Sequence, residues 1–150
     1  MRVHIGTDHA GFELKQFLVA KLRDDGYDVV DHGSHVYDAA DDYPVYCIPC
    51  AEAVVADGTL GIVLGGSGNG EQLAANKVKG CRAILATEPD LARLGREHNN
   101  ANVIAIGGRF GTREDAWNLV KIFLTTPFSE EPRHIRRLAM LDTYERQGRL

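Results

Sequence analysis

Three absences narrow the class of protein to which this chain belongs. There is no excess of positive charge, because 17 Lys and Arg residues stand against 21 Asp and Glu residues and the net charge is -4. Nucleic-acid-binding proteins usually carry a basic excess or patch. No apolar run approaches the ~20 residues that cross a bilayer, and the opening segment MRVHIGTDHAG shows no secretory leader pattern. We therefore expect a cytoplasmic protein that binds neither nucleic acid nor membrane.

Cysteine is also scarce, with only Cys47, Cys50 and Cys81 in the chain. The first two form a C-x-x-C pair, but no second pair completes a zinc site. The strand that precedes the C-x-x-C of a thioredoxin-like redox site is missing as well. We expect the pair to pack on the inner face of a helix, because free cysteine is among the most buried residue types. No metal site is predicted.

What the chain does contain is a regular alternation of strand and helix patterns within 150 residues, a length typical of one domain. We predict a single domain over residues 1–150. The expected strands cover residues 2–8, 27–33, 60–66, 81–87 and 102–108. The expected helices cover residues 11–26, 45–58, a segment from the glycine-rich stretch to about Val78, 88–100, 112–127 and 133–146. Such alternation predicts an α/β fold, a three-layer sandwich with a five-stranded parallel sheet and a C-terminal helix.

Local signals place several helix ends. Gly26 is placed to terminate the first helix, Pro44 suits the first turn of the second, and Thr112 suits the N-cap of the helix that follows the last strand.

Ligands of open α/β sheets bind outside the carboxyl ends of the strands. Asp8 and His9 follow the first expected strand, the stretch GGSGNGEQ (residues 65–72) follows the third, and Arg109 follows the fifth. One edge of the sheet should therefore gather a carboxylate, an imidazole, a run of backbone amides, Glu71 and a guanidinium.

The glycine-rich stretch is not a standard phosphate loop. Gly65 and Gly70 have the spacing of a P-loop, but Glu71 and Gln72 stand where Lys and Ser or Thr would follow. The G-x-G-x-x-G pattern of dinucleotide sites is not matched either. Amides at a helix start could bind a phosphate or an oxyanion that develops during a reaction. A tight turn with a solvated Glu71 is the alternative.

Two further clusters lie late in the chain. Arg133 and Arg137 are four residues apart in the last expected helix and share a face, which suits a phosphate dianion or a simple exposed basic surface. His98 and Asn99 end the helix over residues 88–100. That helix starts at the strand carboxyl edge and runs back, so its end should lie far from Glu71 in the same chain. If these residues act together, a second subunit must supply His98.

Several of these motifs together carry a resemblance. GTDHAG, DYP, GGSGNGEQLAANKVKGCRA, REHNNANVIAIGGR and RHIRR are similar, in order and spacing, to the ribose-5-phosphate isomerase B family, which includes galactose-6-phosphate isomerase subunits. The resemblance implies a Rossmann-like fold and a homodimer, with a tetramer as a further option. It also implies active sites shared between subunits and an aldose–ketose isomerisation of a sugar phosphate, typically ribose 5-phosphate to ribulose 5-phosphate, without metal or cofactor.

The resemblance also implies roles for individual residues. Catalysis would involve Glu71, His98, Asp8 and Ser67. Substrate binding would involve His9, Tyr43, the loop amides of Gly66, Gly68, Asn69 and Gly70, then Asn99, and the phosphate ligands Arg109, Arg133 and Arg137.

One departure from the family pattern concerns the base. Many members have Cys at the position of Gly65, and that thiolate is taken as the base; this chain resembles the subgroup with Glu at the position of Glu71. The reaction would then pass through a cis-enediolate, with Glu71 as the base.

Three alternatives remain open. The substrate could be a six-carbon aldose 6-phosphate of the allose or galactose type, or an unphosphorylated sugar. A flavodoxin-like nucleotide-binding module could use the same loop, although Glu71 and the lack of aromatic residues near the strand ends disfavour it.

Overall fold

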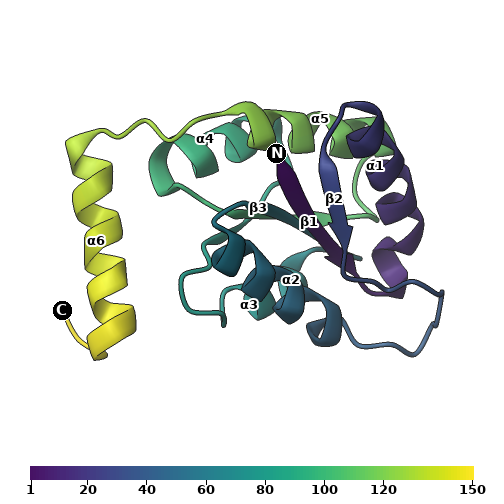
Figure 1. The fold of residues 1–150 in the computed structure, drawn as a ribbon, viewed down its shortest axis with the longest axis horizontal. Helices are drawn as coiled ribbons and strands as arrows, with labels where there is room; N and C mark the ends of the chain where they lie inside the picture. The colour runs from purple at the N-terminus through teal and green to yellow at the C-terminus, as the bar shows by residue number, and fades with distance from the viewer.

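The computed structural model describes all residues from Met1 to Leu150, and Figure 1 shows strands interleaved with helices. The strands are β1 (Arg2–Thr7), β2 (Asp28–Asp31), β3 (Leu60–Gly65), β4 (Ala83–Leu85) and β5 (Val103–Gly107). The helices are α1 (Phe12–Asp24), α2 (Pro44–Asp57), α3 (Asn69–Ala75), α4 (Pro89–Asn99), α5 (Arg113–Thr125) and α6 (Pro132–Gln147), with a 3-10 turn η1 (His9–Gly11). The strands pair in the order β2-β1-β3-β5-β4, all parallel. The predicted α/β class and five-stranded parallel sheet are confirmed.

Helices cover both faces of the sheet because the central strands are apolar on both sides. In β3, Ile62 and Leu64 belong to one buried cluster and Val63 to the other. The first cluster includes residues of α1, α4 and α5, and the second includes residues of α2 and α3. Figure 1 shows the same division, with α1, α4 and α5 along one side of the strands and α2 and α3 along the other. The result is a three-layer sandwich.

The strand order places a topological switch point at the end of β3. This strand lies between β1 and β5, which lead into α1 and α5 on one face, whereas β3 leads into α3 on the opposite face. The chain therefore leaves β3 toward one face of the sheet and leaves its two neighbouring strands toward the other. Such reversals are where open α/β sheets bind their ligands.

Most of the predicted helix ends agree with the structure. Gly26 follows α1 with a φ of 87°, Pro44 opens α2, and Thr112 caps α5 by accepting a hydrogen bond from the Asp115 amide. One prediction was too long, since α3 ends at Ala75 rather than near Val78. The Asn76 side chain exchanges two hydrogen bonds with the Ala83 backbone, at 2.8 and 2.9 Å. It thereby draws the chain toward β4 and away from further helix.

The three cysteines are free and buried, as predicted. Cys47 and Cys50 lie on the inner face of α2 in the second cluster. Burial raises the pKa of both thiols and raises that of Cys81 to about 12. Thiols of this kind pack as small apolar groups and are poor nucleophiles.

The last helix stands apart from the sandwich. Figure 1 shows α6 at one end of the molecule, joined to α5 by an extended segment. Its one buried residue is His134, and Glu145 near its end accepts a hydrogen bond of 3.0 Å from the Gly80 amide. No helix of the structure has the length and apolar character to cross a membrane.

Candidate active site

The ends of three neighbouring strands bring the predicted edge residues together. Thr7 of β1 pairs with Leu64 of β3, and Gly65 of β3 pairs with Gly107 of β5. The segments that follow these residues carry Asp8, the glycine-rich loop and Arg109, so all three emerge side by side at the carboxyl edge of the sheet.

Backbone hydrogen bonds from the residues that follow β5 hold the glycine-rich loop in place. The carbonyls of Gly65 and Gly66 accept hydrogen bonds from the amides of Gly108 (2.7 Å) and Arg109 (3.1 Å). Gly68 turns the chain into α3 with a φ of 84°, a conformation that side chains other than glycine rarely adopt. Holding the carbonyls in this way fixes which direction the loop amides face.

Several loop amides are left without a backbone partner. The N–H groups of Gly66, Ser67 and Gly70 donate to no other backbone group of the chain, while the Asn69 amide donates to Ser67 Oγ at 3.2 Å. Ser67 and Asn69 are both exposed. Free amides at a helix start form a site for negative charge.

Glu71 lies in the first turn of α3 and is 4% exposed. Burial raises the pKa of its carboxyl, and the negative charge of Asp8 raises it further, against the lowering effect of the Glu71 and Gly68 amides. Backbone amides at the helix start lower the pKa of a carboxyl and burial raises it; for Glu71, burial prevails. A carboxylate in this environment is suited to accept a proton near neutral pH.

Gly65 makes room for this carboxylate. A Cβ built on Gly65 would overlap the carboxyl atoms of Glu71. Position 65 must therefore be glycine, because the Glu71 carboxylate occupies the volume that a side chain at this position would fill.

Asp8 and His9 lie beside the loop on the 3-10 turn. Asp8 is 7% exposed and caps the turn, with its Oδ1 accepting from the Ala10 amide at 2.9 Å. The His9 Nδ1 lies 4.0 Å from Asp8 Oδ2 and 2.7 Å from Oδ1 of Asp41. The sequence pattern gave no role to Asp41, because an acidic loop before a helix has no fixed spacing from His9. Together, Asp8, His9 and Asp41 are the group of side chains whose geometry could hold a metal ion; His9 and Asp41 already engage each other.

Tyr43 and Arg109 flank the loop. A Cβ built on Gly70 would lie 2.6 Å from Cζ of Tyr43, and one built on Gly66 would lie 3.0 Å from the nearest guanidinium nitrogen of Arg109. The absence of side chains at these two glycines lets the phenol ring and the guanidinium lie directly against the loop backbone.

The remaining predicted residues gather at the opposite edge of the sheet. His98 and Asn99 end α4, where the carbonyl of Asn99 accepts from Arg82, the residue that precedes β4. The His98 ring stacks on that of His134, with centroids 4.2 Å apart and planes at 19°. Burial and the charge of His98 lower the pKa of His134.

Arg133 and Arg137 lie on the exposed surface of α6. Arg133 pairs with Glu131 at 2.9 Å. A single chain therefore contains two separate groups of predicted site residues. We call them the carboxyl-edge group (Asp8, His9, Tyr43, Ser67, Glu71, Arg109 and the loop amides) and the amino-edge group (His98, Asn99, Arg133 and Arg137).

Fold and site together define an α/β protein with a buried acid beside a loop of unpartnered amides at the strand carboxyl edge. The chain belongs to the ribose/galactose isomerase family, whose model matches residues 3–141. This membership sets aside the flavodoxin-like alternative.

Individual relatives agree along nearly the whole chain. The ribose-5-phosphate isomerase B of Mycolicibacterium paratuberculosis is 56% identical over 97% of this chain and 92% of its own length, and that of Mycobacterium tuberculosis is 55% identical over 97% and 91%. The structure of the Clostridium thermocellum ribose-5-phosphate isomerase B superposes with a TM-score of 0.94 at 38% identity, covering 99% of each chain. The Mycoplasma genitalium enzyme, solved with bound ribulose-5-phosphate, gives a TM-score of 0.93 at 37% identity, covering 97% of each chain.

Proposed function

We propose that this protein interconverts ribose 5-phosphate and ribulose 5-phosphate through a cis-enediolate, with Glu71 as the base. The observation that carries the proposal is the buried Glu71 carboxylate beside a loop with unpartnered amides. High identity to ribose-5-phosphate isomerases B supports the substrate pair, as does the ribulose-5-phosphate bound to the Mycoplasma genitalium relative.

The steps of the reaction can be assigned to individual residues of the two edge groups. The sugar ring must open before isomerisation, and we assign this acid–base step to His98 and Asp8. Glu71 then takes the C2 proton of the open aldose, leaving an enediolate whose negative oxygen faces the loop amides. Ser67 passes the O2 proton to O1, and Glu71 returns its proton to C1 to give the ketose. One carboxylate can serve both carbons because C1 and C2 are adjacent.

The amides and the raised pKa of Glu71 support this order of events. The N–H groups of Gly66, Ser67 and Gly70 are free of backbone partners, so they can stabilise the enediolate oxygens without first breaking other bonds. The raised pKa of Glu71 favours a residue that accepts and then returns the same proton.

The phosphate is assigned to arginines. Arg109 lies at the carboxyl-edge group, and Arg133 and Arg137 lie on the exposed surface of α6. A guanidinium can make two parallel hydrogen bonds to a phosphate. His9, Tyr43 and Asn99 are assigned to the sugar hydroxyls.

A homodimer unites the two edge groups. Since His98 and Glu71 lie at opposite edges of one sheet, we propose that the amino-edge group of one subunit completes the carboxyl-edge group of the other. The isolated chain exposes apolar side chains along α6, namely Ile135, Met140, Leu141 and Tyr144, and a second subunit would cover them. The cytoplasmic location and assembly into tetramers stay predictions.

The test is a panel of aldose phosphates with kcat/KM measured for each. We expect ribose 5-phosphate to be preferred over allose 6-phosphate and galactose 6-phosphate. The family name includes galactose, so a higher value for a six-carbon substrate would establish the alternative. Absence of turnover with every aldose phosphate would refute the proposed activity.

A further inference from the structure

The loop between β2 and α2 places a buried carboxylate behind the His9 ring. Oδ1 of Asp41 accepts a hydrogen bond from the His9 backbone amide at 2.9 Å and lies 2.7 Å from His9 Nδ1. The Asp41 side chain is only 6% exposed, whereas that of His9 is 27% exposed. Asp41 therefore lies behind the candidate site, where it contacts His9 without forming the surface that a sugar would meet.

This geometry has a direct consequence for the imidazole. A carboxylate is an acceptor only, so Nδ1 must carry the hydrogen of the 2.7 Å contact. Nε2 is then the free nitrogen, and the ring cannot rotate without losing the Asp41 contact. An imidazole whose second nitrogen is fixed in this way presents one defined atom to a ligand.

The charges around His9 come from three elements. Asp41 on the loop contributes most and raises the pKa of the His9 imidazolium, Asp8 at the end of β1 raises it further, and burial and Arg109 after β5 act in the opposite direction. The Tyr37 ring stands edge-on to His9, with centroids 6.3 Å apart. The balance favours the protonated ring.

Asp41 itself is kept ionised. Burial on its own raises the pKa of this carboxyl, but the hydrogen bonds from the His9 amide and ring, together with the nearby Tyr46 hydroxyl, outweigh it, so the pKa is lowered. The negative charge beside His9 is therefore present at every pH at which the imidazole titrates.

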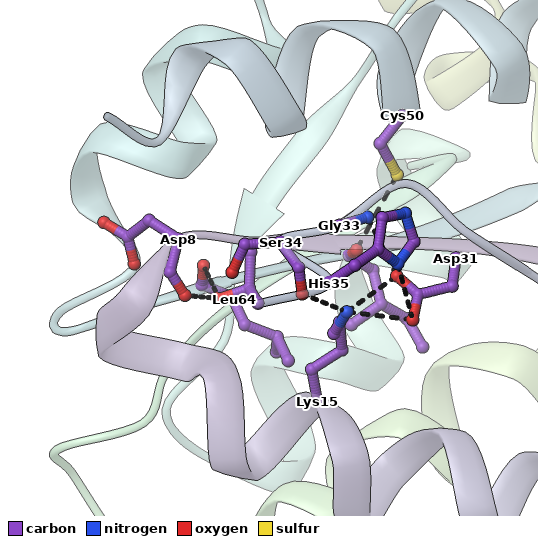
Figure 2. Close-up of polar contacts among 10 residues, drawn as sticks. Asp8, Lys15, Asp31, Gly33, Ser34, His35, Cys50 and Leu64 are labelled. Carbon is purple, nitrogen blue, oxygen red and sulfur yellow. Dashed lines mark hydrogen bonds and ion pairs between the residues drawn. The ribbon is translucent and has the colours of Figure 1, made fainter. Parts of the chain in front are cut away.

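The loop that carries Asp41 is anchored to helix α1. Lys15 is 2% exposed, and its Nζ lies 2.8 Å from both carboxylate oxygens of Asp31 and donates to the Ser34 carbonyl at 2.6 Å. Figure 2 shows Lys15 pointing between these two partners. Asp31 Oδ1 also accepts from the Gly33 amide at 2.8 Å. An ion pair between buried Lys15 and half-buried Asp31, with added hydrogen bonds to the Ser34 carbonyl and the Gly33 amide, holds the start of the loop.

The end of β1 holds the same loop from the other side. The Thr7 amide donates to the Gly33 carbonyl at 2.8 Å, and the Ser34 amide donates to the Thr7 carbonyl at 2.7 Å. Because Thr7 immediately precedes Asp8 and His9, these two backbone hydrogen bonds connect the start of the loop directly to the strand end that carries the site residues. The position of Asp41 relative to His9 is thus built into the fold.

We propose that Asp41 is a positioning residue for the isomerase site: it orients the His9 ring and fixes hydrogen on Nδ1, so that Nε2 is the nitrogen presented to an oxygen of the sugar phosphate. The inference rests on the proposed function for its ligand. It assigns Asp41 no contact with substrate.

The primary test measures the protonation and tautomer of the His9 ring directly, in the full-length protein without substrate. Histidine ring nitrogens are followed by NMR across pH, and the His9 signals are identified by their loss in His9→Gln. We expect Asp41→Asn to lower the pKa of His9 while keeping hydrogen on Nδ1, since an amide oxygen still accepts. Asp41→Ala should lower the pKa and allow both neutral tautomers. The matched control is Asp42→Asn, an exposed acid one residue further on, which should leave the His9 titration unchanged.

Activity supplies the second readout. With ribose 5-phosphate, Asp41→Asn should lose about tenfold in kcat/KM at pH 8, the scale of one hydrogen bond to a charged group. Activity should return toward the wild-type value as the pH falls and His9 is protonated again. A merely structural role would lower activity equally at all pH values.

The outcomes separate the two proposals. An unchanged His9 titration in Asp41→Asn, or an equal change in Asp42→Asn, would overturn the positioning role. A lowered His9 pKa with unchanged kcat/KM at every pH would support the positioning role and contradict the place of His9 in the proposed isomerase site. Asp41→Asn preserves size and hydrogen bonding, so this variant keeps the test valid even if Asp41→Ala does not fold.

Discussion

The two edges of the sheet are built differently. At the carboxyl edge, Glu71 and Asp8 are 4% and 7% exposed, and hydrogen bonds from the residues that follow β5 hold the glycine loop. At the amino edge, Asn99, Arg133 and Arg137 are exposed, on a helix end and on the protruding α6. Proton transfer needs a desolvated group with an adjusted pKa, whereas phosphate capture needs long charged side chains. The difference teaches that the carboxyl edge is built for the proposed proton transfers at C1 and C2, whereas the amino edge presents His98 and the proposed phosphate ligands of α6 near the surface.

The largest effect should follow from removing the base. Glu71→Gln keeps the shape of the side chain but cannot accept the C2 proton, so we expect kcat to fall by about 10²–10⁴-fold. Affinity for the sugar phosphate should be retained, because the proposed phosphate ligands are untouched. The measurement is steady-state kinetics with calorimetric binding of substrate.

The control for that variant is Glu52→Gln on the exposed surface of α2, which should behave as wild type. Turnover of Glu71→Gln close to that of the control would remove Glu71 from the mechanism.

A methyl group at position 65 should lower the activity of the same site while leaving the Glu71 carboxylate itself in the chain. In Gly65→Ala the new Cβ would overlap the Glu71 carboxylate, so the carboxylate must move, and misplacement of about 1 Å can cost on the order of 10²-fold in rate. We expect kcat to fall by about 10–10²-fold. Gly108→Ala is the comparison, because its added Cβ would meet its nearest neighbour at 3.4 Å. Equal losses in both variants would contradict the specific role of Gly65.

Loss of a proposed phosphate ligand on α6 should change KM rather than kcat. Arg137→Ala removes one guanidinium from α6, and the loss of a charged hydrogen bond to phosphate is expected to raise KM by about tenfold or more, with kcat nearly unchanged. Arg136→Ala, one residue away and also exposed, is the matched control. If the KM of Arg137→Ala equals that of Arg136→Ala, the phosphate role of Arg137 is lost.

The smallest expected effect is on stability. Because burial raises the pKa of Glu71 in the folded state, its stabilising contribution is full below the ordinary pKa of glutamate and is lost as the pH rises through the raised pKa. Glutamine stays neutral, so the free energy of unfolding of Glu71→Gln should exceed that of wild type at pH 8. The difference should shrink toward pH 4.

Urea unfolding at fixed protein concentration measures this difference, since subunit association contributes to stability. A wild-type protein that is more stable than Glu71→Gln at pH 8 would show that burial does not dominate the environment of Glu71.

Sequence patterns gave the sheet, its helices and the edge where Glu71 lies, because strand alternation and parallel topology fix where strand ends meet. They could not give the relation between Gly65 and Glu71, which depends on one side chain occupying the volume of another. The early end of α3 depends on Asn76 reaching Ala83 across the chain. The Asp41–His9 contact depends on the path of a loop of no regular structure. Contacts of this kind are set by tertiary geometry, which local patterns do not encode.

The central claim is that one active site needs both edges, each from a different subunit. Mixed dimers of His98→Ala and Glu71→Gln subunits, purified through two different tags, test it most directly. Each parent should be nearly inactive, and the mixed dimer should regain about half of the wild-type activity, because one of its two sites then contains both intact groups. Mixed dimers of Asp8→Asn and Glu71→Gln should stay inactive, since both changes fall in the carboxyl-edge group. Failure of the first pair to regain activity in verified mixed dimers would contradict the account.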